Sequence, residues 1–214
     1  TTIKRDLEFF RNFMNWAIKK KYALTNPVKE IELGKETNKI APILSMQEIQ
    51  RLFSESDVTF IKTFLMIGFF TGLRLSEILG IKWEHVNFTN KSISIFDTKK
   101  NKDEIIFMND ELSKYLESVK QDDGFVVSHP DGAHYVNIYK TIDRIALKAG
   151  IKRRIRPHQL RHTFATILLE NGVSPRTVMD LGRWSSLSQL QRYTEATDPS
   201  KRQAVETLAS ALHK

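Results

Sequence analysis

The chain has 214 residues, which is enough for one sizeable domain or for one domain with a fragment of another. It contains no cysteine, so disulfide frameworks and thiolate chemistry are excluded, and no apolar run is long enough to span a membrane. A net charge of +8, with basic residues clustered at 98–102 and 148–156, favours a polyanionic partner such as nucleic acid.

The first predicted element is a long amphipathic helix over residues 2–21, whose apolar residues recur at helical spacing. Phe9, Phe13 and Trp16 widen its apolar stripe beyond what a lone surface helix needs, so we expect a partner that this chain mostly lacks. The sequence has no initiating methionine, which indicates an excised piece of a longer protein. Prolines and a glycine without periodicity then predict a linker, which places a domain boundary near residues 33–42.

The next helices are predicted from their start and stop signals. Ser45 and Glu48 form a capping box that opens the helix "SMQEIQRLF". The most apolar run, over residues 57–70, predicts a buried core helix that ends near Gly72. The stretch "LRLSEIL" then begins a short new helix.

The second half of the chain adds one hairpin and several helices. Residues 91–108 hold two short β-rich runs around a lysine-rich turn, which predicts the hairpin. Capping and glycine signals predict helices over residues 110–119, 135–149, 157–172, 174–182 and 199–212. The fold class is therefore α+β, mostly helical, with a small antiparallel β-sheet.

His158 and Arg161 lie three residues apart on one of these helices and therefore share a face. An arginine can hold two phosphate oxygens at once, so the pair suits an anionic ligand, although a surface arginine beside a satisfied histidine is the alternative. His158 and His162 also have the spacing of a zinc-binding pair, but Gln159 stands where that motif carries glutamate. We therefore expect no metal.

Arg74 and Glu77 are also three residues apart, just after a glycine. They form either an ordinary ion pair or an arginine whose carboxylate partner fixes its direction. Lys99, Lys100 and Lys102 occupy the hairpin turn, where a lysine is either simply solvated or able to reach a substrate and donate a proton.

Tyr193 lies in the polar segment "SQLQRYTEA", which is an unusual setting for a core tyrosine. A phenol has a pKa of about 10, so a nucleophilic tyrosine needs a base and positive charge nearby. The arginines, the histidine and the hairpin lysine are groups of that kind, but their spacing does not show that they meet.

Taken together, four blocks of the sequence resemble the tyrosine recombinases, the phage-integrase family. The blocks are "TGLRLSEILGIKWEHV", "TKKNKDEIIFM", "HQLRHTFAT" and "LGRWSSLSQLQRYTEA", in the order of the family and at suitable separations. The resemblance implies a catalytic domain over residues 43–214. It also implies a linker over residues 34–42, preceded by the C-terminal part of a helical core-binding domain over residues 1–33.

The resemblance also implies catalytic roles for individual residues within these blocks. Arg74 and Arg161 would hold the scissile phosphate, and Tyr193 would attack it to give a 3′-phosphotyrosine link. Lys99, which aligns better than the other hairpin lysines, would protonate the leaving 5′-oxygen. His158 would assist proton transfer with the tyrosine.

Two further positions complete the implied site. Glu77 fills the acidic position that supports the arginine and the histidine. Trp184 stands where most members carry a second histidine, nine residues before the tyrosine, and its indole N–H can donate a hydrogen bond but cannot titrate. We therefore expect it to buttress the site rather than to shuttle a proton. The basic residues expected to contact DNA are Lys100, Lys102, Arg153, Arg154 and Arg183.

The implied function is cleavage and rejoining of double-stranded DNA attachment sites, without metal, ATP or another cofactor. The implied assembly is a homotetramer on DNA, formed from protomers that are monomeric when free, in the cytoplasm of a bacterial cell or of a mobile element's host. The helix over residues 199–212 would dock either on a neighbouring protomer or on its own domain. The alternatives are a type IB topoisomerase-like enzyme and a non-enzymatic basic DNA-binding regulator.

Overall fold

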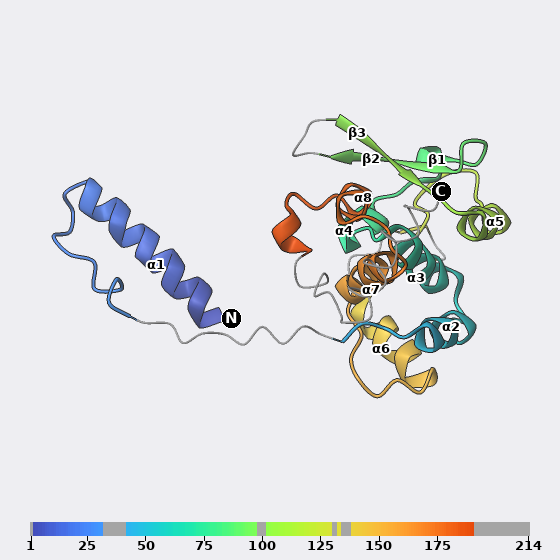
Figure 1. Ribbon diagram of the computed structural model, residues 1–214, viewed down its shortest axis with the longest axis horizontal. Helices are drawn as coiled ribbons and strands as arrows, with labels where there is room; N and C mark the ends of the chain where they lie inside the picture. The colour runs from blue at the N-terminus through green and yellow to red at the C-terminus, as the bar shows by residue number, and fades with distance from the viewer. Residues whose placement is uncertain (1, 32–41, 98–101, 130–131, 134–137, 191–214) are drawn as a thin grey trace, which may run out of the picture. The chain divides into compact units, whose positions relative to one another are not determined.

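The computed structural model describes residues 2–31, 42–97, 102–129, 132–133 and 138–190 (Figure 1). The chain divides into two compact units, Thr1–Ile40 and Ala41–Lys214. None of the helices in the described ranges combines the length and the apolar character that a bilayer crossing requires.

The first unit is the helix α1 (Thr2–Lys19) with the segment that follows it. The Arg11 side chain donates hydrogen bonds to the carbonyls of Val28 and Ile31, which hold this segment along the helix. The aromatic side chains Phe9 and Phe13 are 65% and 49% exposed. The unit therefore presents the aromatic stripe that was expected from the sequence.

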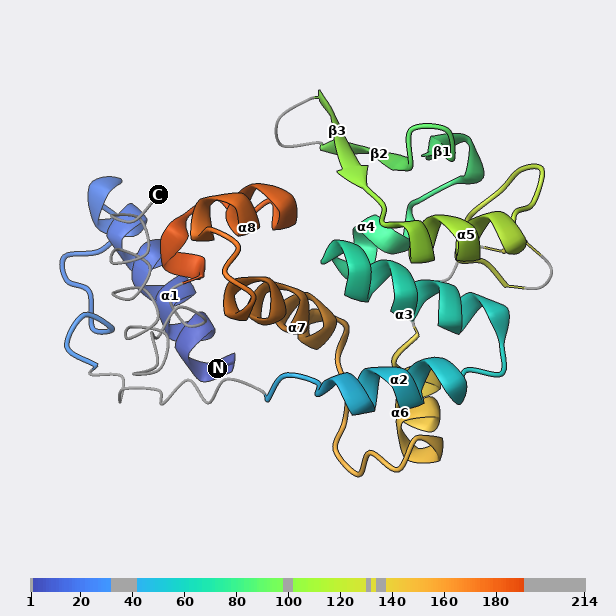
Figure 2. The same ribbon diagram turned by 45° about the vertical axis from the view of Figure 1, so that its right-hand side comes forward.

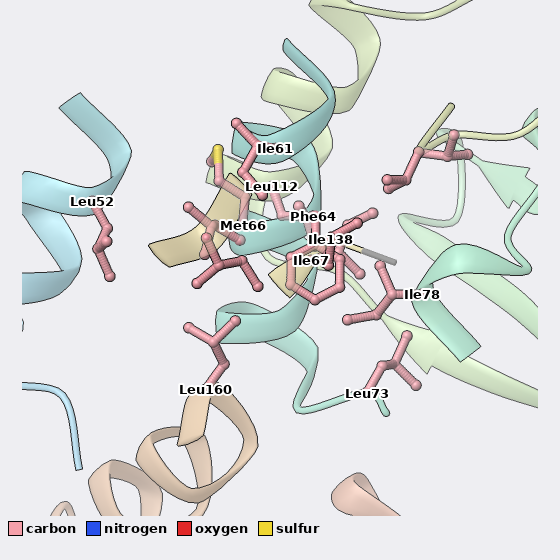
Figure 3. Packing of buried hydrophobic residues seen from close by; sticks show 14 of the residues in the cluster. Leu52, Ile61, Phe64, Met66, Ile67, Leu73, Ile78, Leu112, Ile138 and Leu160 are labelled. Atoms are coloured by element: carbon pink, nitrogen blue, oxygen red, sulfur yellow. The ribbon is translucent and has the colours of Figure 1, made fainter. Parts of the chain in front are cut away.

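The core of the second unit is built around α3 (Thr59–Thr71), of whose 13 residues eight are buried. Figure 3 shows Phe64 and Ile67 of this helix beside Ile78 and Leu160, which come from two other helices. The helices that pack against α3 are α2 (Met46–Ser54), α4 (Leu75–Leu79), α5 (Asp110–Ser118) and α7 (Pro157–Glu170). The prediction of a buried core helix is confirmed.

Helix α7 approaches α3 closely, because a Cβ atom at Gly68 would lie 2.9 Å from the Leu160 side chain. The predicted capping box of α2 is present as well: Ser45 accepts a hydrogen bond from the Glu48 N–H, and the Glu48 carboxylate accepts one from the Ser45 N–H. The close contact with α3 positions α7, the helix that carries His158 and Arg161.

The sheet has three antiparallel strands, β1 (Val86–Asn87), β2 (Ser92–Asp97) and β3 (Lys102–Phe107), in the order β1-β2-β3. Strands β2 and β3 form the predicted hairpin, with Ser94 opposite Ile105. Ile93 and Ile106 are buried on one face, as alternation requires. Strand β1 was not predicted, because two residues are too few to show alternation.

The remaining helices are α6 (Tyr139–Lys148), α8 (Pro175–Gly182) and the 3₁₀ turns η1 (Trp83–His85) and η2 (Leu187–Gln189). Helix α8 begins at the predicted pair Ser174 and Pro175 and packs on α7 (Figures 1 and 2). The helix expected over residues 199–212 lies outside the described residues. The α+β fold, mostly helical with one small antiparallel sheet, is confirmed.

Candidate active site

Arg74 lies in the turn between α3 and α4, directly after the residues that end α3. Gly72 adopts a φ of +64°, and a Cβ atom there would lie 2.5 Å from the Phe164 ring, so only glycine suits this turn. The Arg74 N–H donates to Glu77 Oε2 at 2.7 Å, and Arg74 Nη1 donates to Glu77 Oε1 at 2.9 Å. Arg74 Nη2 donates to the Arg183 carbonyl at 3.3 Å. Three contacts therefore direct an arginine whose side chain is still 48% exposed.

Arg161 lies on the face of α7 that meets this turn, and it is only 7% exposed. Its Nη1 donates to the Gly72 carbonyl at 2.7 Å. Its guanidinium carbon lies 4.0 Å from the ring centroid of Trp184, a cation–π contact. A Cβ atom at Gly182 would lie 1.7 Å from the Trp184 ring, so the indole packs directly on the Gly182 backbone. Arg161 is thus held between a carbonyl and an aromatic face, and Trp184 buttresses it.

Arg183 lies at the end of α8, where its carbonyl accepts from Arg74 and the next residue, Trp184, stacks on Arg161. Its side chain is 8% exposed and forms an ion pair with Glu77. Its Nε lies 2.7 Å from Oε2 of Glu104, a residue of β3 that is also largely buried. A DNA contact by the Arg183 guanidinium, as expected from the sequence, does not fit this enclosure between two carboxylates.

Glu104 was not among the residues singled out from the sequence. The signal that could have found it is alternation, because Glu104 lies on the same face of β3 as the buried Ile106. A carboxylate on a buried face needs a cationic partner. Nothing in the spacing of the sequence identifies Arg183 as that partner.

Glu77 is the acidic centre of this cluster. Burial raises its pKa, but hydrogen bonds from the backbone and side chain of Arg74 and the charges of Arg183 and Arg74 outweigh burial. The net result is a pKa below the ordinary value of 4.5, so the carboxylate is ionised at neutral pH. The cluster then contains three guanidinium groups, of Arg74, Arg161 and Arg183, and two carboxylates, of Glu77 and Glu104, and this excess of positive charge favours an anion.

His158 lies in the first turn of α7, with its ring centroid 5.5 Å from that of His162 in an edge-to-face arrangement. Burial and, secondarily, the charge of Arg156 lower its pKa below the ordinary value of 6.5. The imidazole is therefore neutral at pH 7 and can accept a proton. Within the part of the chain that the structure describes, no three histidine or acidic side chains converge as metal ligands would.

The structure thus brings Arg74, Glu77, Arg161 and Trp184 together, with His158 one helical turn away on α7. The expected nucleophile Tyr193 and the lysines Lys99 and Lys100 lie outside the described residues. Lys102 begins β3.

The other two basic candidates differ in their surroundings. Arg153 is half-buried, and its Nη2 donates to Glu48 Oε2 at 2.9 Å and to the Ile43 carbonyl at 3.0 Å. Arg154 is exposed. Arg154 is therefore better placed to meet a phosphate than Arg153.

An apolar hollow of about 1140 Å³ adjoins the cluster, between β3 and the helices α3, α7 and α8. Phe69, Phe164, Leu168 and Met179 contribute to its lining, and Arg183 and Trp184 lie at one side of it. The site therefore has an apolar surface beside its charged groups.

A mostly helical domain in which an arginine from the turn before α4 and an arginine from α7 lie beside a tryptophan is typical of a catalytic domain of the tyrosine recombinase class. The family model described as "Phage integrase family" matches residues 42–199, and the chain belongs to this family. It is a tyrosine-type DNA strand transferase of site-specific recombination, and neither the topoisomerase nor the regulator alternative is favoured.

Individual relatives support the same assignment. The chain is 31% identical over 215 residues to a tyrosine recombinase of Pseudothermotoga lettingae, covering 97% of this chain and 75% of the relative. It is 32% identical over 213 residues to the tyrosine recombinase XerD of Staphylococcus epidermidis, covering 92% of this chain and 72% of the relative.

Solved structures share the fold. The crystal structure of XerA recombinase has a TM-score of 0.68 at 25% identity, covering 95% of this chain and 82% of the other. The Tn1549 transposon integrase in complex with a circular intermediate DNA has a TM-score of 0.78 at 21% identity, covering 96% of this chain and 79% of the other.

Proposed function

We propose that Arg74 and Arg161 bind the non-bridging oxygens of a scissile DNA phosphate and that Tyr193 attacks its phosphorus. The tyrosine oxygen forms a bond to phosphorus while the bond to the 5′-oxygen breaks, which leaves a 3′-phosphotyrosine and a free 5′-hydroxyl. The observation that carries this proposal is the pair of contacts that brings the two arginines together. Arg161 donates to the Gly72 carbonyl in the turn that carries Arg74, and Arg74 donates to the carbonyl of Arg183, the residue before the Trp184 ring that stacks on Arg161. Donors held in advance stabilise charge that develops in the transition state.

Two proton transfers accompany this displacement. His158 accepts the proton of the tyrosine, which its lowered pKa supports because the imidazole is neutral at pH 7. Lys99, in the turn between β2 and β3, gives a proton to the leaving 5′-oxygen. The reverse transfers rejoin the strand.

The arginines supply the positive charge that a metal ion supplies in other phosphoryl-transfer enzymes, so the reaction needs no cation. It also needs no ATP, because the phosphotyrosine link conserves the energy of the phosphodiester bond. Trp184 contributes by holding the Arg161 guanidinium through its ring face.

We infer that the substrate is a double-stranded DNA attachment site in the cytoplasm. Solved relatives include the XerH recombinase bound to its difH substrate and the Tn1549 integrase bound to transposon DNA. The net charge of +8 supports phosphate binding, with affinity that falls steeply as salt rises. Lys100, Lys102 and Arg154 remain the proposed backbone contacts.

The domain organisation is also a proposal. Residues 1–33 are the end of a core-binding domain, joined by a linker over residues 34–42 to the catalytic domain. Four protomers assemble on DNA, and the helix over residues 199–212 docks on a neighbour. Its apolar residues Val205, Leu208 and Leu212 suit an apolar receptor such as the hollow between β3 and α8. A chain that ends at residue 198 should then bind one DNA site but fail to pair two sites in a gel-shift assay.

A nicked suicide substrate carrying the element's own attachment site tests the reaction. Wild-type protein in EDTA should form a covalent adduct that survives denaturation, and Tyr193→Phe should form none. Binding of the site without any adduct would favour the regulator. Supercoil relaxation without strand exchange would favour the topoisomerase-like enzyme.

A further inference from the structure

Arg183 has a backbone conformation that an arginine rarely adopts. It is the C-cap of α8 with a φ of 57° and a ψ of 45°, in the left-handed region. Glycine usually fills this position at a helix end, because any Cβ atom raises the energy of the conformation. Helix termination alone would therefore favour glycine over arginine here.

The Arg183 side chain carries two further costs. A guanidinium that is 8% exposed has lost most of its hydration. Its Nη1 and Nε are buried and make no well-aligned hydrogen bond among the described residues, so the 2.7 Å approach of Nε to Glu104 Oε2 acts as an ion pair rather than as a directed hydrogen bond. Because these costs are unfavourable for folding, we expect the role of Arg183 to lie in the groups that its side chain holds together.

The contacts of Arg183 join three elements of the site. Its side chain pairs with Glu77 of α4 and with Glu104 of β3, and its carbonyl accepts a hydrogen bond from Arg74. The next residue, Trp184, packs against Arg161. The Glu104 pair therefore joins β3 to Arg183, which in turn contacts Arg74 and precedes the tryptophan that stacks on Arg161.

We propose that Arg183 is a positioning residue that, through Glu104, holds strand β3 in register with Arg74 and Arg161. This inference rests on the proposed function, in which Lys99 protonates the leaving oxygen. Strand β3 begins at Lys102, three residues after Lys99 in the sequence. Fixing β3 therefore fixes one end of the turn that carries the proton donor.

The test separates proton donation from the rest of the reaction. Glu104→Gln removes the charge on β3 and leaves the Glu77 pair in place. It is compared with wild type for single-turnover adduct formation at saturating DNA, on an ordinary substrate and on one with sulfur replacing the bridging 5′-oxygen. A thiol ionises near pH 8.5, whereas an alcohol needs a proton to leave, so the sulfur substrate does not depend on the lysine.

Glu104→Gln should slow cleavage of the ordinary substrate by about tenfold or more, as misplaced catalytic groups do. It should cleave the sulfur substrate at close to the wild-type rate. Equal slowing on both substrates, or slowing on neither, would overturn the inference. If wild type itself forms no adduct with either substrate, the proposed function fails instead.

A second variant guards against misfolding as the cause. Arg183→Gly suits the left-handed backbone and removes the side chain, so it should slow the ordinary substrate at least as much as Glu104→Gln. The double variant should be no slower than Arg183→Gly, because both changes remove one interaction. Additive losses would contradict the link. Arg176→Ala, which removes an exposed ion pair with Asp180 on the same helix, should cleave like wild type.

Discussion

Two arginines of the second unit, Arg153 and Arg183, each bridge a carboxylate and another part of the chain, but with different consequences. Arg153 bridges Glu48 of the α2 capping box and the Ile43 carbonyl, and its backbone has no positive φ. Arg183 bridges Glu77 and Glu104 from a strained backbone, beside the two arginines that we propose bind the phosphate. The first cluster fastens a helix start to a distant loop, and the second joins the elements that carry the proposed catalytic groups. The groups around an ion pair therefore determine whether its loss lowers the free energy of unfolding or the rate of cleavage.

The largest effect is expected at Arg161. Arg161→Lys cannot keep both the Gly72 hydrogen bond and the planar stack on Trp184, so cleavage should fall about 10²- to 10³-fold, as when a transition-state donor is removed. Single-turnover adduct formation at saturating DNA measures this. A cleavage rate within tenfold of wild type would show that stabilisation of the transition state does not depend on the Arg161 guanidinium.

A smaller effect is expected at Trp184. Trp184→Ala removes the aromatic face beneath Arg161, and a desolvated cation–π contact of about 2 kcal/mol predicts roughly 30-fold slower cleavage. Trp184→Phe keeps a ring and should lose much less. Equal rates for the two variants would mean that stacking is not what Trp184 supplies.

The pH dependence should be modest and one-sided. Because the pKa of His158 lies below 6.5, the neutral imidazole predominates at pH 7, and cleavage should fall only as the pH drops through that lowered pKa. Stability should fall as the pH drops from about 6.5 to that lowered pKa, because over this range the unfolded state binds more protons than the folded state. Rates from pH 5 to 8 test this against His158→Gln, whose acidic limb should be flatter. A half-maximal rate above pH 6.5 would contradict the assignment.

The smallest effect on rate is expected in the Arg153 cluster. Glu48→Ala removes the α2 capping box and the Arg153 pair, so the free energy of unfolding should fall by about 1–3 kcal/mol. Cleavage at saturating DNA, well below the melting temperature, should match wild type. Lys148→Ala, which breaks an exposed pair with Asp57, is the control and should change neither quantity measurably. If Glu48→Ala cleaves more slowly than wild type while it is fully folded, the claim that the Arg153 cluster affects stability but not rate would be wrong.

Local signals predicted most of this fold. The capping box at Ser45, the break at Gly72 and the Ser174–Pro175 start are short-range patterns, and each marks a helix end in the structure. Strand β1 was missed, since its two residues are defined by pairing with β2 rather than by their own sequence.

The site was predicted less completely, because its contacts join distant parts of the chain. The i,i+3 spacing indicated the Arg74–Glu77 pair, and the structure shows it. Alternation could have indicated that Glu104 is buried, but its contact with Arg183 could not be found from the sequence, because an ion pair between a strand and a helix end leaves no periodic trace. The sequence suggested a DNA contact for Arg183, because it is basic and lies next to Trp184. The structure instead pairs its buried side chain with Glu77 and Glu104.

Identifying the amino acid that becomes joined to DNA tests the central claim most directly. The adduct formed on the suicide substrate would be digested with nuclease and trypsin, and the modified peptide would be sequenced by mass spectrometry. The account predicts a phosphotyrosine-linked nucleotide on the peptide that begins at Tyr193, immediately after Arg192, with the DNA attached through its 3′ end. Attachment at another tyrosine, such as Tyr115 or Tyr139, or through a 5′ phosphate, would contradict it.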